Sequence, residues 1–331
     1  MPYGIAILGL DHWYTAFAAL DQLTASTDTP LIGVSDPDPA RRDALRARYP
    51  AATMVADAAE LLARDDVRLV AICAATDLAP ALAMDALAMG KDVVCVKPAA
   101  RDLAELDGVL EAARAAGRFF GSFEGMQRLH PKARVARDLI QGGAIGTPLS
   151  FHQRGHGGLP APWPGTTGDS WWTDAARVPG GAWIDHALYA IDFARYVLGD
   201  GGIEVVGSRI ENRIHPDLPV EDYGIVLLQL TPARADTPPV SLLLEDTWCA
   251  ASGGGASRTE FLGTQGILRL DGADWVVTSG GSETRHSIPT APFFDFTALA
   301  HALTTGAAPP FGPADARANL AVCLEAYARA R

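Results

Sequence analysis

The chain opens with the segment YGIAILGLDHWYT (residues 3–15), in which a short apolar run ends at Gly9 and gives way to a stretch with helical spacing. A strand that ends in glycine just before a helix is typical of the first turn of a dinucleotide-binding sheet. A second apolar run covers residues 31–36 and is closed by the sequence Asp-Pro-Asp-Pro. The start of the chain therefore predicts a strand–helix–strand unit.

The same alternation of strand and helix signals continues to about residue 123. The expected strands cover residues 3–9, 31–36, 69–74, 92–96 and 119–123, and the expected helices cover residues 15–23, 39–49, 78–89 and 102–116. Strands with few polar residues, separated by helices, are typical of a parallel sheet that is covered on both faces. We therefore expect an α/β protein whose residues 1–123 form a Rossmann domain with a doubly wound parallel sheet.

The pattern changes in the remaining residues, 124–331. Expected helices cover residues 131–141, 182–198, 293–305 and 314–329, and expected strands cover residues 203–214, 223–230, 240–248, 259–262 and 266–270. Because the strands are joined by short or polar connections, we expect an α+β domain with a large, mostly antiparallel sheet. Residues 155–180 are rich in Gly, Pro and Trp and read as a long loop, and so long a loop is usually functional.

Length and composition narrow the classes of function. A chain of 331 residues fits two domains, and 39 acidic against 27 basic residues give a formal net charge of −12. This excess of acid argues against nucleic acid or an anionic membrane as the main partner. No apolar run is long enough to cross a membrane, and no leader-like segment opens the chain, so we expect a cytoplasmic protein. The four cysteines are scattered without metal-ligand spacing, so we expect neither a disulfide framework nor a bound metal.

The nucleotide-binding motif is degraded. A full fingerprint reads Gly-x-Gly-x-x-Gly, and here Asp11 takes the second glycine position, where a charge is unfavourable unless it points away. Asp36 follows 27 residues after Gly9, where a carboxylate binds ribose hydroxyls and repels a 2′-phosphate, so NAD is favoured over NADP. The alternative for Asp36 is a solvated turn residue. Arg41 and Arg42 either reach a 2′-phosphate or begin a solvated helix.

Two further clusters carry reactive side chains. Lys97 and Pro98 directly follow the fourth strand, and ligands of parallel sheets lie outside the carboxyl ends of the strands. The alternative is a surface lysine at a strand end. On the helix at 182–198, Asp185, Tyr189 and Asp192 share one face, because they are spaced i, i+4 and i+7. Such polar groups on an apolar helix must be paired or face a cleft; the alternative is a helix-start carboxylate and a core tyrosine.

With these clusters the chain resembles the Gfo/Idh/MocA family, the relatives of glucose–fructose oxidoreductase and inositol dehydrogenase. The resemblance spans nearly the whole chain and rests on four segments in the family's order: residues 90–98, 142–146, 180–192 and 263–266. The first is similar to the family's stretch ending in Glu-Lys-Pro and the third to its glycine-led active-site helix. The second and fourth are similar to a helix-end turn and to a turn of the C-terminal sheet.

Three departures from the family pattern bear on function. Val96 replaces the family's Glu, and residues 75–79 lack its Pro-Asn-x-x-His. On the active-site helix most relatives carry His four residues after the Asp, whereas this chain carries Tyr189, as the glucose–fructose oxidoreductase type and dihydrodiol dehydrogenases do. His186 is turned about 100° away from Asp185 and is a poorer base.

The resemblance implies an NAD(P)-dependent oxidoreductase that transfers a hydride between a nicotinamide cofactor and a secondary alcohol of a sugar, inositol or related polyol. The catalytic residues would be Lys97, Asp185 and Tyr189. The cofactor would be held by Gly9, Asp11, His12, Trp13, Asp36, Ala74, Thr76, Lys97 and Pro98. The substrate would be bound by Lys97, Arg128, His156, Trp172, Asp185, His186, Tyr189 and Asp192.

In this hypothesis Tyr189 takes the hydroxyl proton. Because a free tyrosine has a pKa near 10, the positive charge of Lys97 and of the oxidised nicotinamide would have to lower the pKa of Tyr189. Tryptophans around the cleft would either stack on a sugar ring or pack between domains or subunits. These are Trp163, Trp171, Trp172 and Trp183.

Two alternative functions stay open at this point. One is a relative that retains NAD and uses transient oxidation for glycoside cleavage or epimerisation. The other is a non-catalytic ligand-binding relative, suggested by Asp11, Val96 and Ala79. The resemblance also implies a homodimer or homotetramer formed through the C-terminal sheet.

Overall fold

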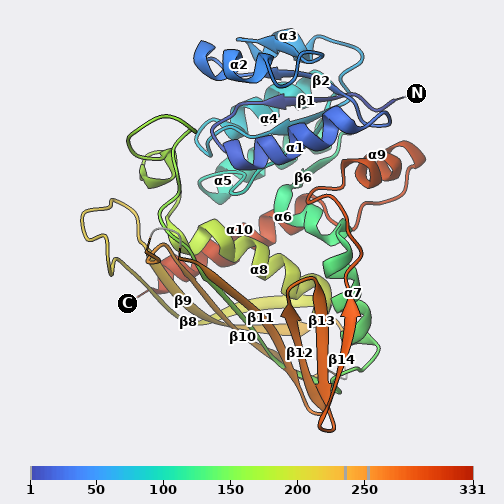
Figure 1. Cartoon of the computed structure of the whole chain (residues 1–331), viewed down its shortest axis with the longest axis vertical. Coiled ribbons are helices and arrows are strands. Elements are labelled where there is room, and N and C mark those ends of the chain that lie inside the picture. Colours follow the sequence, from blue (N-terminus) through green and yellow to red (C-terminus); the bar gives the residue numbers. More distant parts are fainter. Residues whose placement is uncertain (1, 235–236, 252–253, 331) are drawn as a thin grey trace.

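The computed structural model describes residues 2–234, 237–251 and 254–330 and contains two sheets, one in each half of the chain (Figure 1). The first sheet lies at the N-terminal end of the elongated molecule and the second at the opposite end, with helices α6, α8 and α10 between them. The expected fold class is confirmed: a parallel sheet is followed by a mostly antiparallel one.

The first sheet has six parallel strands in the order β3-β2-β1-β4-β5-β6. The strands are β1 (Ile5–Leu8), β2 (Leu31–Ser35), β3 (Thr53–Val55), β4 (Leu69–Ile72), β5 (Asp92–Cys95) and β6 (Phe120–Ser122). Both β2 and β4 pair with β1, so the strand order reverses there. In open parallel sheets this reversal creates a crevice at the carboxyl ends of the strands, where ligands bind.

Helices cover both faces of this sheet. They are α1 (Trp13–Ala25), α2 (Pro39–Arg46), α3 (Ala58–Leu62), α4 (Ala79–Ala88) and α5 (Leu103–Ala116). Local sequence explains their ends: the Asp102 carboxylate accepts from the N–H of Glu105 to cap α5, and Gly117 ends it in the left-handed conformation. The short elements β3 and α3 were not expected from the sequence, because three to five residues carry too little periodicity to recognise.

The second sheet has eight strands in the order β14-β13-β12-β11-β7-β10-β9-β8. Only β7 and β10 pair in parallel; every other neighbouring pair among the described strands is antiparallel. The strands are β7 (Pro148–His156), β8 (Asp200–Glu211), β9 (Tyr223–Pro232), β10 (Val240–Thr247), β11 (Ala256–Gly263), β12 (Gly266–Asp271), β13 (Asp274–Ser279) and β14 (Ser282–Ser287).

The helices of the second half pack against this sheet or against the first half; Phe296 and Leu299 of the helix Phe296–Thr305 belong to an apolar cluster with Ile5 and Ala16 of the first half. They are α6 (Phe123–Met126), α7 (Pro131–Gln141), α8 (Ala182–Leu198), α9 (Phe296–Thr305) and α10 (Pro313–Arg329), with short 3-10 turns at Gln127–Leu129 and Trp171–Thr173. Helix α8 contacts β7, β9 and β10, and α10 contacts both β8 and the first half through α5 and β6. One apolar cluster runs from Val70 and Ile72 of the first sheet to Leu242 and Phe261 of the second. None of the described helices is long and apolar enough to cross a membrane.

Candidate active site

The turn after β1 lies at the crevice between β1 and β4. Gly9 has a φ of +78°, and a Cβ on it would stand 2.6 Å from the Cβ of Ala74. Only glycine fits this turn, because the backbone is left-handed and β4's continuation passes directly beside it. The left-handed backbone and the closeness of Ala74 thus explain why glycine occupies the first position of the fingerprint.

A cavity of about 1120 Å³ opens at the carboxyl ends of β1, β2 and β4 and is lined by Gly9, Ser35, Asp36 and Ala74 among others. The Asp36 carboxylate accepts hydrogen bonds from the backbone N–H groups of Leu10 and Asp38, both at 2.9 Å. Burial raises the pKa of Asp36. Because a carboxylate offers about four acceptor positions, it retains capacity for ribose hydroxyls.

Asp11 lies on the wall of the same cavity, at the lost second glycine position. Its carboxylate is satisfied by the protein: Oδ1 lies 3.0 Å from Arg41 Nη1, and Oδ2 accepts from the N–H of Ala75 at 3.0 Å. The Arg41 guanidinium also lies 5.3 Å from the ring centre of Trp163 and 3.4 Å from Asp36. The negative charge of Asp11, which is unfavourable at this position of the fingerprint, is thus compensated by the guanidinium of Arg41.

Three other residues expected at the cofactor have defined surroundings. His12 is fully buried, and Trp13 donates from Nε1 to the carbonyl of Ala161 at 3.2 Å. Thr76 follows β4 and is 1% exposed, and its Oγ1 has no hydrogen-bond partner among the described residues. A buried hydroxyl without a partner is costly unless a ligand completes it. Together with the cavity, the Asp36 carboxylate and the neutralised Asp11, this hydroxyl fits an adenine dinucleotide.

Lys97 stands at the end of β5, and the bond between Lys97 and Pro98 is cis. Lys97 Nζ lies 2.5 Å from Asp185 Oδ1 and also donates to the backbone carbonyl of Asp185. The other carboxylate oxygen accepts from Trp248 Nε1 at 3.1 Å. Burial alone would raise the pKa of Asp185, but the charges of His186 and Lys97 outweigh it and hold the pKa below its usual range.

A second cavity, of about 380 Å³, contains Lys97, Asp185, His186 and Tyr189 on its wall. Lys97 Nζ lies 5.5 Å from the ring centre of Tyr189 and 4.5 Å from that of Trp172. The residues around these groups are Tyr14, Thr15, Gln127, Lys132, Ala133, Gln153, Ala190, Phe193, Ser257, Thr259, Leu270 and Phe293. The ammonium and the phenol that the sequence separates by 92 positions therefore lie in one pocket.

The protonation state of Tyr189 corrects an expectation. Burial raises the pKa of Tyr189, and the charges of Glu124 and Asp185 act in the same direction. In the structure Tyr189 is a neutral phenol that donates a proton or a hydrogen bond.

Three residues expected at the substrate are placed elsewhere. Arg128 and Asp192 form a buried ion pair, with Nη2–Oδ1 at 2.7 Å and Nε–Oδ2 at 2.9 Å, and Asn319 donates to the same Asp192 at 2.9 Å. His156 lies 2.8 Å from Thr247 Oγ1. None of these side chains lines the cavity around Lys97, so the structure does not bring Arg128, Asp192 and His156 together with Lys97 and Tyr189. The polar groups of these three side chains have hydrogen-bond partners within the protein. The sequence shows which residue types are present but does not show these partners.

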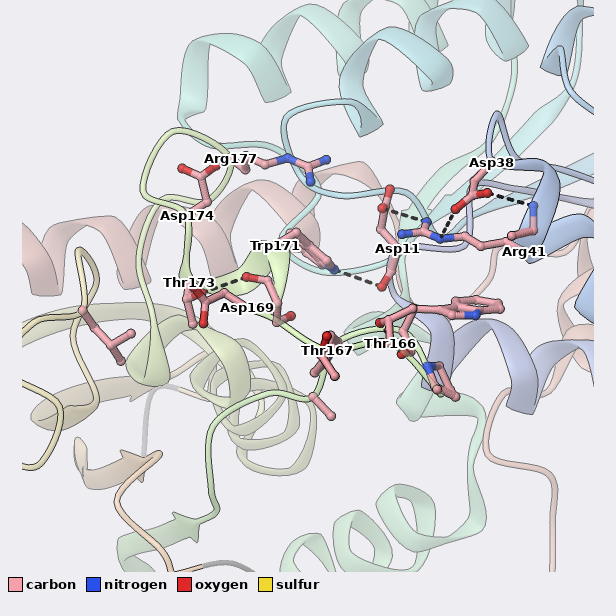
Figure 2. Close-up of a pocket in the computed structure, with 18 of the residues that line it drawn as sticks. Asp11, Asp38, Arg41, Thr166, Thr167, Asp169, Trp171, Thr173, Asp174 and Arg177 are labelled. Carbon is pink, nitrogen blue, oxygen red and sulfur yellow. Dashed lines mark hydrogen bonds and ion pairs between the residues drawn. The ribbon is translucent and has the colours of Figure 1, made fainter.

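The long connection between β7 and α8 crosses the mouth of the first half. We call residues 157–178 the strap. In Figure 2 the strap borders a cavity of about 780 Å³, and Trp171 reaches the backbone of Asp11 while Arg41 lies between Asp11 and Asp38. Trp171 Nε1 donates to the Asp11 carbonyl at 3.0 Å, and Arg177 Nε lies 3.1 Å from Asp77 Oδ1. The expected functional loop therefore lies over the crevice.

Two residues of the site were not singled out from the sequence. Trp248 orients Asp185 from β10's end, 63 positions away, and no local pattern indicates that contact. Tyr14 occupies the third glycine position of the fingerprint, and this departure from the motif is the feature of the sequence that indicates an unusual residue there. Among the described residues no group of three or more His, Cys, Asp or Glu side chains could hold a metal ion.

Comparison with known proteins places both halves of the chain. Residues 3–123 match the family model of an oxidoreductase family with an NAD-binding Rossmann fold, and residues 133–269 match that of the GFO/IDH/MocA C-terminal domain. The inositol 2-dehydrogenase of Acidothermus cellulolyticus is 30% identical over 149 residues, which are 45% of this chain and 42% of that protein. The chain thus matches less than half the length of that relative.

Solved structures of similar shape cover the whole chain. An oxidoreductase from Agrobacterium radiobacter in complex with NAD+, L-tartaric acid and magnesium has a TM-score of 0.80 at 19% identity, with 100% of this chain and 96% of that chain covered. A 3-ketoreductase from Actinomadura kijaniata in complex with NADP and TDP-benzene has a TM-score of 0.81 at 23% identity, with 100% and 98% covered. At these identities the likeness shows a shared fold.

Proposed function

Because the chain belongs to the Gfo/Idh/MocA family of oxidoreductases, we propose that it transfers a hydride between a nicotinamide cofactor and a secondary alcohol of a sugar, inositol or related polyol. The observation that carries the proposal is the convergence of Lys97, Asp185 and Tyr189 on one cavity at the end of β5. A volume of about 380 Å³ suits a small ligand. The name of the inositol 2-dehydrogenase relative supports the polyol class.

The larger cavity would hold the cofactor, with Asp36 at the adenosine ribose and Ala74 and Thr76 nearer to Lys97. Asp36 favours NAD, because its carboxylate repels a 2′-phosphate. The similar structures contain NAD+ in one protein and NADP in the other, so the choice rests on this residue. When bound, the nicotinamide supplies the hydride acceptor for oxidation and the hydride donor for reduction.

The protein's own groups act on the oxygen of the substrate. Asp185 holds the Lys97 ammonium in place, and Trp248 holds Asp185. Two of the three N–H groups of the Lys97 ammonium bond to Asp185, and the third would bind the substrate oxygen. In the reduction direction the Tyr189 phenol would donate its proton to the carbonyl oxygen and become a tyrosinate, and in the oxidation direction this tyrosinate would take the hydroxyl proton of the alcohol. His186 lies on the same wall, 3.4 Å from Asp185, and would bind a further hydroxyl.

The test compares Lys97→Ala and Tyr189→Phe with the unaltered protein. Each variant should lower turnover by roughly tenfold or more, because each removes a group that contacts the reacting oxygen. NADH formation is followed by absorbance over a panel of inositols, sugars and polyols, and circular dichroism checks the fold. Tyr49→Phe is the matched control, since it removes a phenol that bonds only to Asp21 outside both cavities. Full activity in both active-site variants contradicts the assignment.

We also propose that the chain forms a homodimer or homotetramer through the outer face of its second sheet. Apolar side chains on alternating positions of neighbouring strands support this proposal: Leu227 of β9 pairs with Leu243 of β10, and both are more than a third exposed. Leu262 of β11 is exposed and pairs with Ser150 of β7. Exposed apolar side chains that lie side by side on a sheet mark an interaction surface.

A further inference from the structure

Tyr14 lies in the first turn of α1, on the wall of the cavity that contains Lys97, Asp185 and Tyr189. It occupies the third glycine position of the dinucleotide fingerprint, where glycine normally allows a helix to pack closely on a strand. Its side chain is 40% exposed, so core packing does not explain a large aromatic residue here. Tyr14 is one of the side chains that line this cavity together with Lys97, Asp185 and Tyr189.

The hydroxyl of Tyr14 has one fixed partner. Tyr14 Oη lies 3.1 Å from His12 Nε2, and the two ring centres are 4.2 Å apart. His12 is fully buried, its backbone N–H donates to the Cys73 carbonyl at 2.9 Å, and the ring of Trp172 lies 5.8 Å away. A buried imidazole held on several sides fixes the position of the phenol that it bonds.

The charge balance of the pair limits what it does. Burial lowers the pKa of His12 and the charge of Lys97 lowers it further, so the imidazole stays neutral. Burial, together with the charges of Asp185 and Tyr189, raises the pKa of Tyr14, so the phenol stays protonated. His12 therefore holds the hydroxyl of Tyr14 without taking its proton.

We infer that Tyr14 binds a second hydroxyl of the substrate, next to the one that reacts at Lys97 and Tyr189, and that His12 positions it. The inference rests on the proposed function and deepens it: the substrate would be a vicinal diol rather than an isolated secondary alcohol. A protein site that hydrogen-bonds a substrate hydroxyl rejects the analogue that lacks it, because the protein group is then left unpaired. Tyr14 thus determines specificity, and His12 is a positioning residue.

The experiment measures steady-state kinetics with myo-inositol and 1-deoxy-myo-inositol for the unaltered protein and for Tyr14→Phe. Tyr14→Phe removes only the hydroxyl. It should raise KM for myo-inositol by roughly tenfold with kcat within about threefold, and it should reduce the preference over the deoxy compound by a similar factor. A KM and a preference that both stay unchanged overturn the inference.

A His12→Leu variant tests the positioning role. It should reproduce the KM increase of Tyr14→Phe, and His12→Gln, which restores a polar atom near Nε2, should recover part of the affinity. If His12→Leu raises KM equally for both compounds and His12→Gln recovers no affinity, His12 does not position Tyr14. Such a result would indicate that His12 has a packing role. If none of the tested polyols supports reduction of NAD by the unaltered protein, the proposed function fails. If it turns over myo-inositol while Tyr14→Phe behaves identically, only the inference fails.

Discussion

At the scale of single residues, Arg41 decides whether the degraded fingerprint still accepts an anionic cofactor. Its guanidinium lies within ion-pair distance of Asp11, Asp36 and Asp38. The carboxylate of Asp11 raises the pKa of Arg41 even though burial acts in the opposite direction. An aspartate at the second glycine position would repel a pyrophosphate at close range. Pairing with Arg41 and with the N–H of Ala75 reduces that repulsion, so the loss of two glycines does not by itself exclude cofactor binding.

We predict that Asp36→Ser shifts cofactor preference from NADH toward NADPH by about tenfold or more. The substitution removes the carboxylate that repels a 2′-phosphate and leaves Arg41 beside the ribose site. Fluorescence titration gives the Kd of each cofactor. Asp43→Ser serves as the control, because Asp43 is an exposed residue of α2 that pairs with Arg46. An unchanged ratio of the two Kd values would show that Asp36 does not contact the ribose.

At the scale of elements, the strap is attached to the first half on both sides of the crevice. On one side Trp163 packs edge-on against Phe17 of α1, with ring centres 5.4 Å apart. On the other side Arg177 pairs with Asp77, which precedes α4. Arg177 lines the cavity proposed for the cofactor, and both Trp163 and Arg177 line the adjoining cavity under the strap. We therefore expect exchange of the cofactor to require at least one of these contacts to open.

We therefore predict that the double variant Trp163→Ala and Arg177→Ala releases NADH about tenfold faster. The aromatic contact contributes about 1 kcal/mol and the partly exposed ion pair at most about 1 kcal/mol, and about 1.4 kcal/mol corresponds to tenfold in rate. Stopped-flow displacement of NADH measures the release. Arg285→Ala, which breaks exposed ion pairs on the distant β14, is the control. An unchanged release rate would mean that the strap does not gate the cofactor.

The elements also show how far sequence reasoning reaches. The helices α7 and α8 were predicted with their observed ends, because long amphipathic segments closed by glycine carry a strong periodic signal. Strands β7, β13 and β14 were not predicted. Strand β14 is SETRHS, with no buried side chain, and β7 buries only Phe151, so neither shows the apolar run of a strand. Strand β7 is held by pairing with β10 and β11, about a hundred positions away, and β14 is held by the adjacent β13. The contact of Trp248 with Asp185 is likewise between residues far apart in the sequence.

At the scale of the whole molecule, the two sheets are joined by a buried polar network as well as by the apolar core. Glu124 of α6 directly follows the first sheet, and Asp192 of α8 and Asn319 of α10 belong to the second half (Figure 1). Arg128 pairs with Asp192, and Asn319 donates to it. Because α10 is the last helix and contacts both halves, the end of the chain closes this junction. Residues taken for substrate ligands from the sequence thus hold the two sheets in fixed positions around the site.

Glu124 makes this junction sensitive to pH. Burial raises its pKa to about 7, and the charge of Asp192 acts in the same direction. In the unfolded chain the pKa of a glutamate is about 4.3. Between these values the folded state binds more protons than the unfolded state, so stability is greatest below about pH 4.3 for this group and falls as the pH rises toward 7. Full ionisation of Glu124 in place costs up to about 4 kcal/mol above pH 7, since one pKa unit is 1.36 kcal/mol.

We accordingly predict that Glu124→Gln is more stable than the unaltered protein at pH 8, by up to about 4 kcal/mol, and that this advantage disappears near pH 4.5. Glutamine keeps the shape of the side chain but does not ionise, so the part of the pH dependence that comes from this carboxyl is removed. Denaturant unfolding at pH 4.5, 6 and 8 measures the difference, with exposed Glu60→Gln as the control. A stability difference that is the same at all three values of pH would mean that Glu124 is already ionised in the folded junction, and that the charge is stabilised there by neighbours such as Asn319.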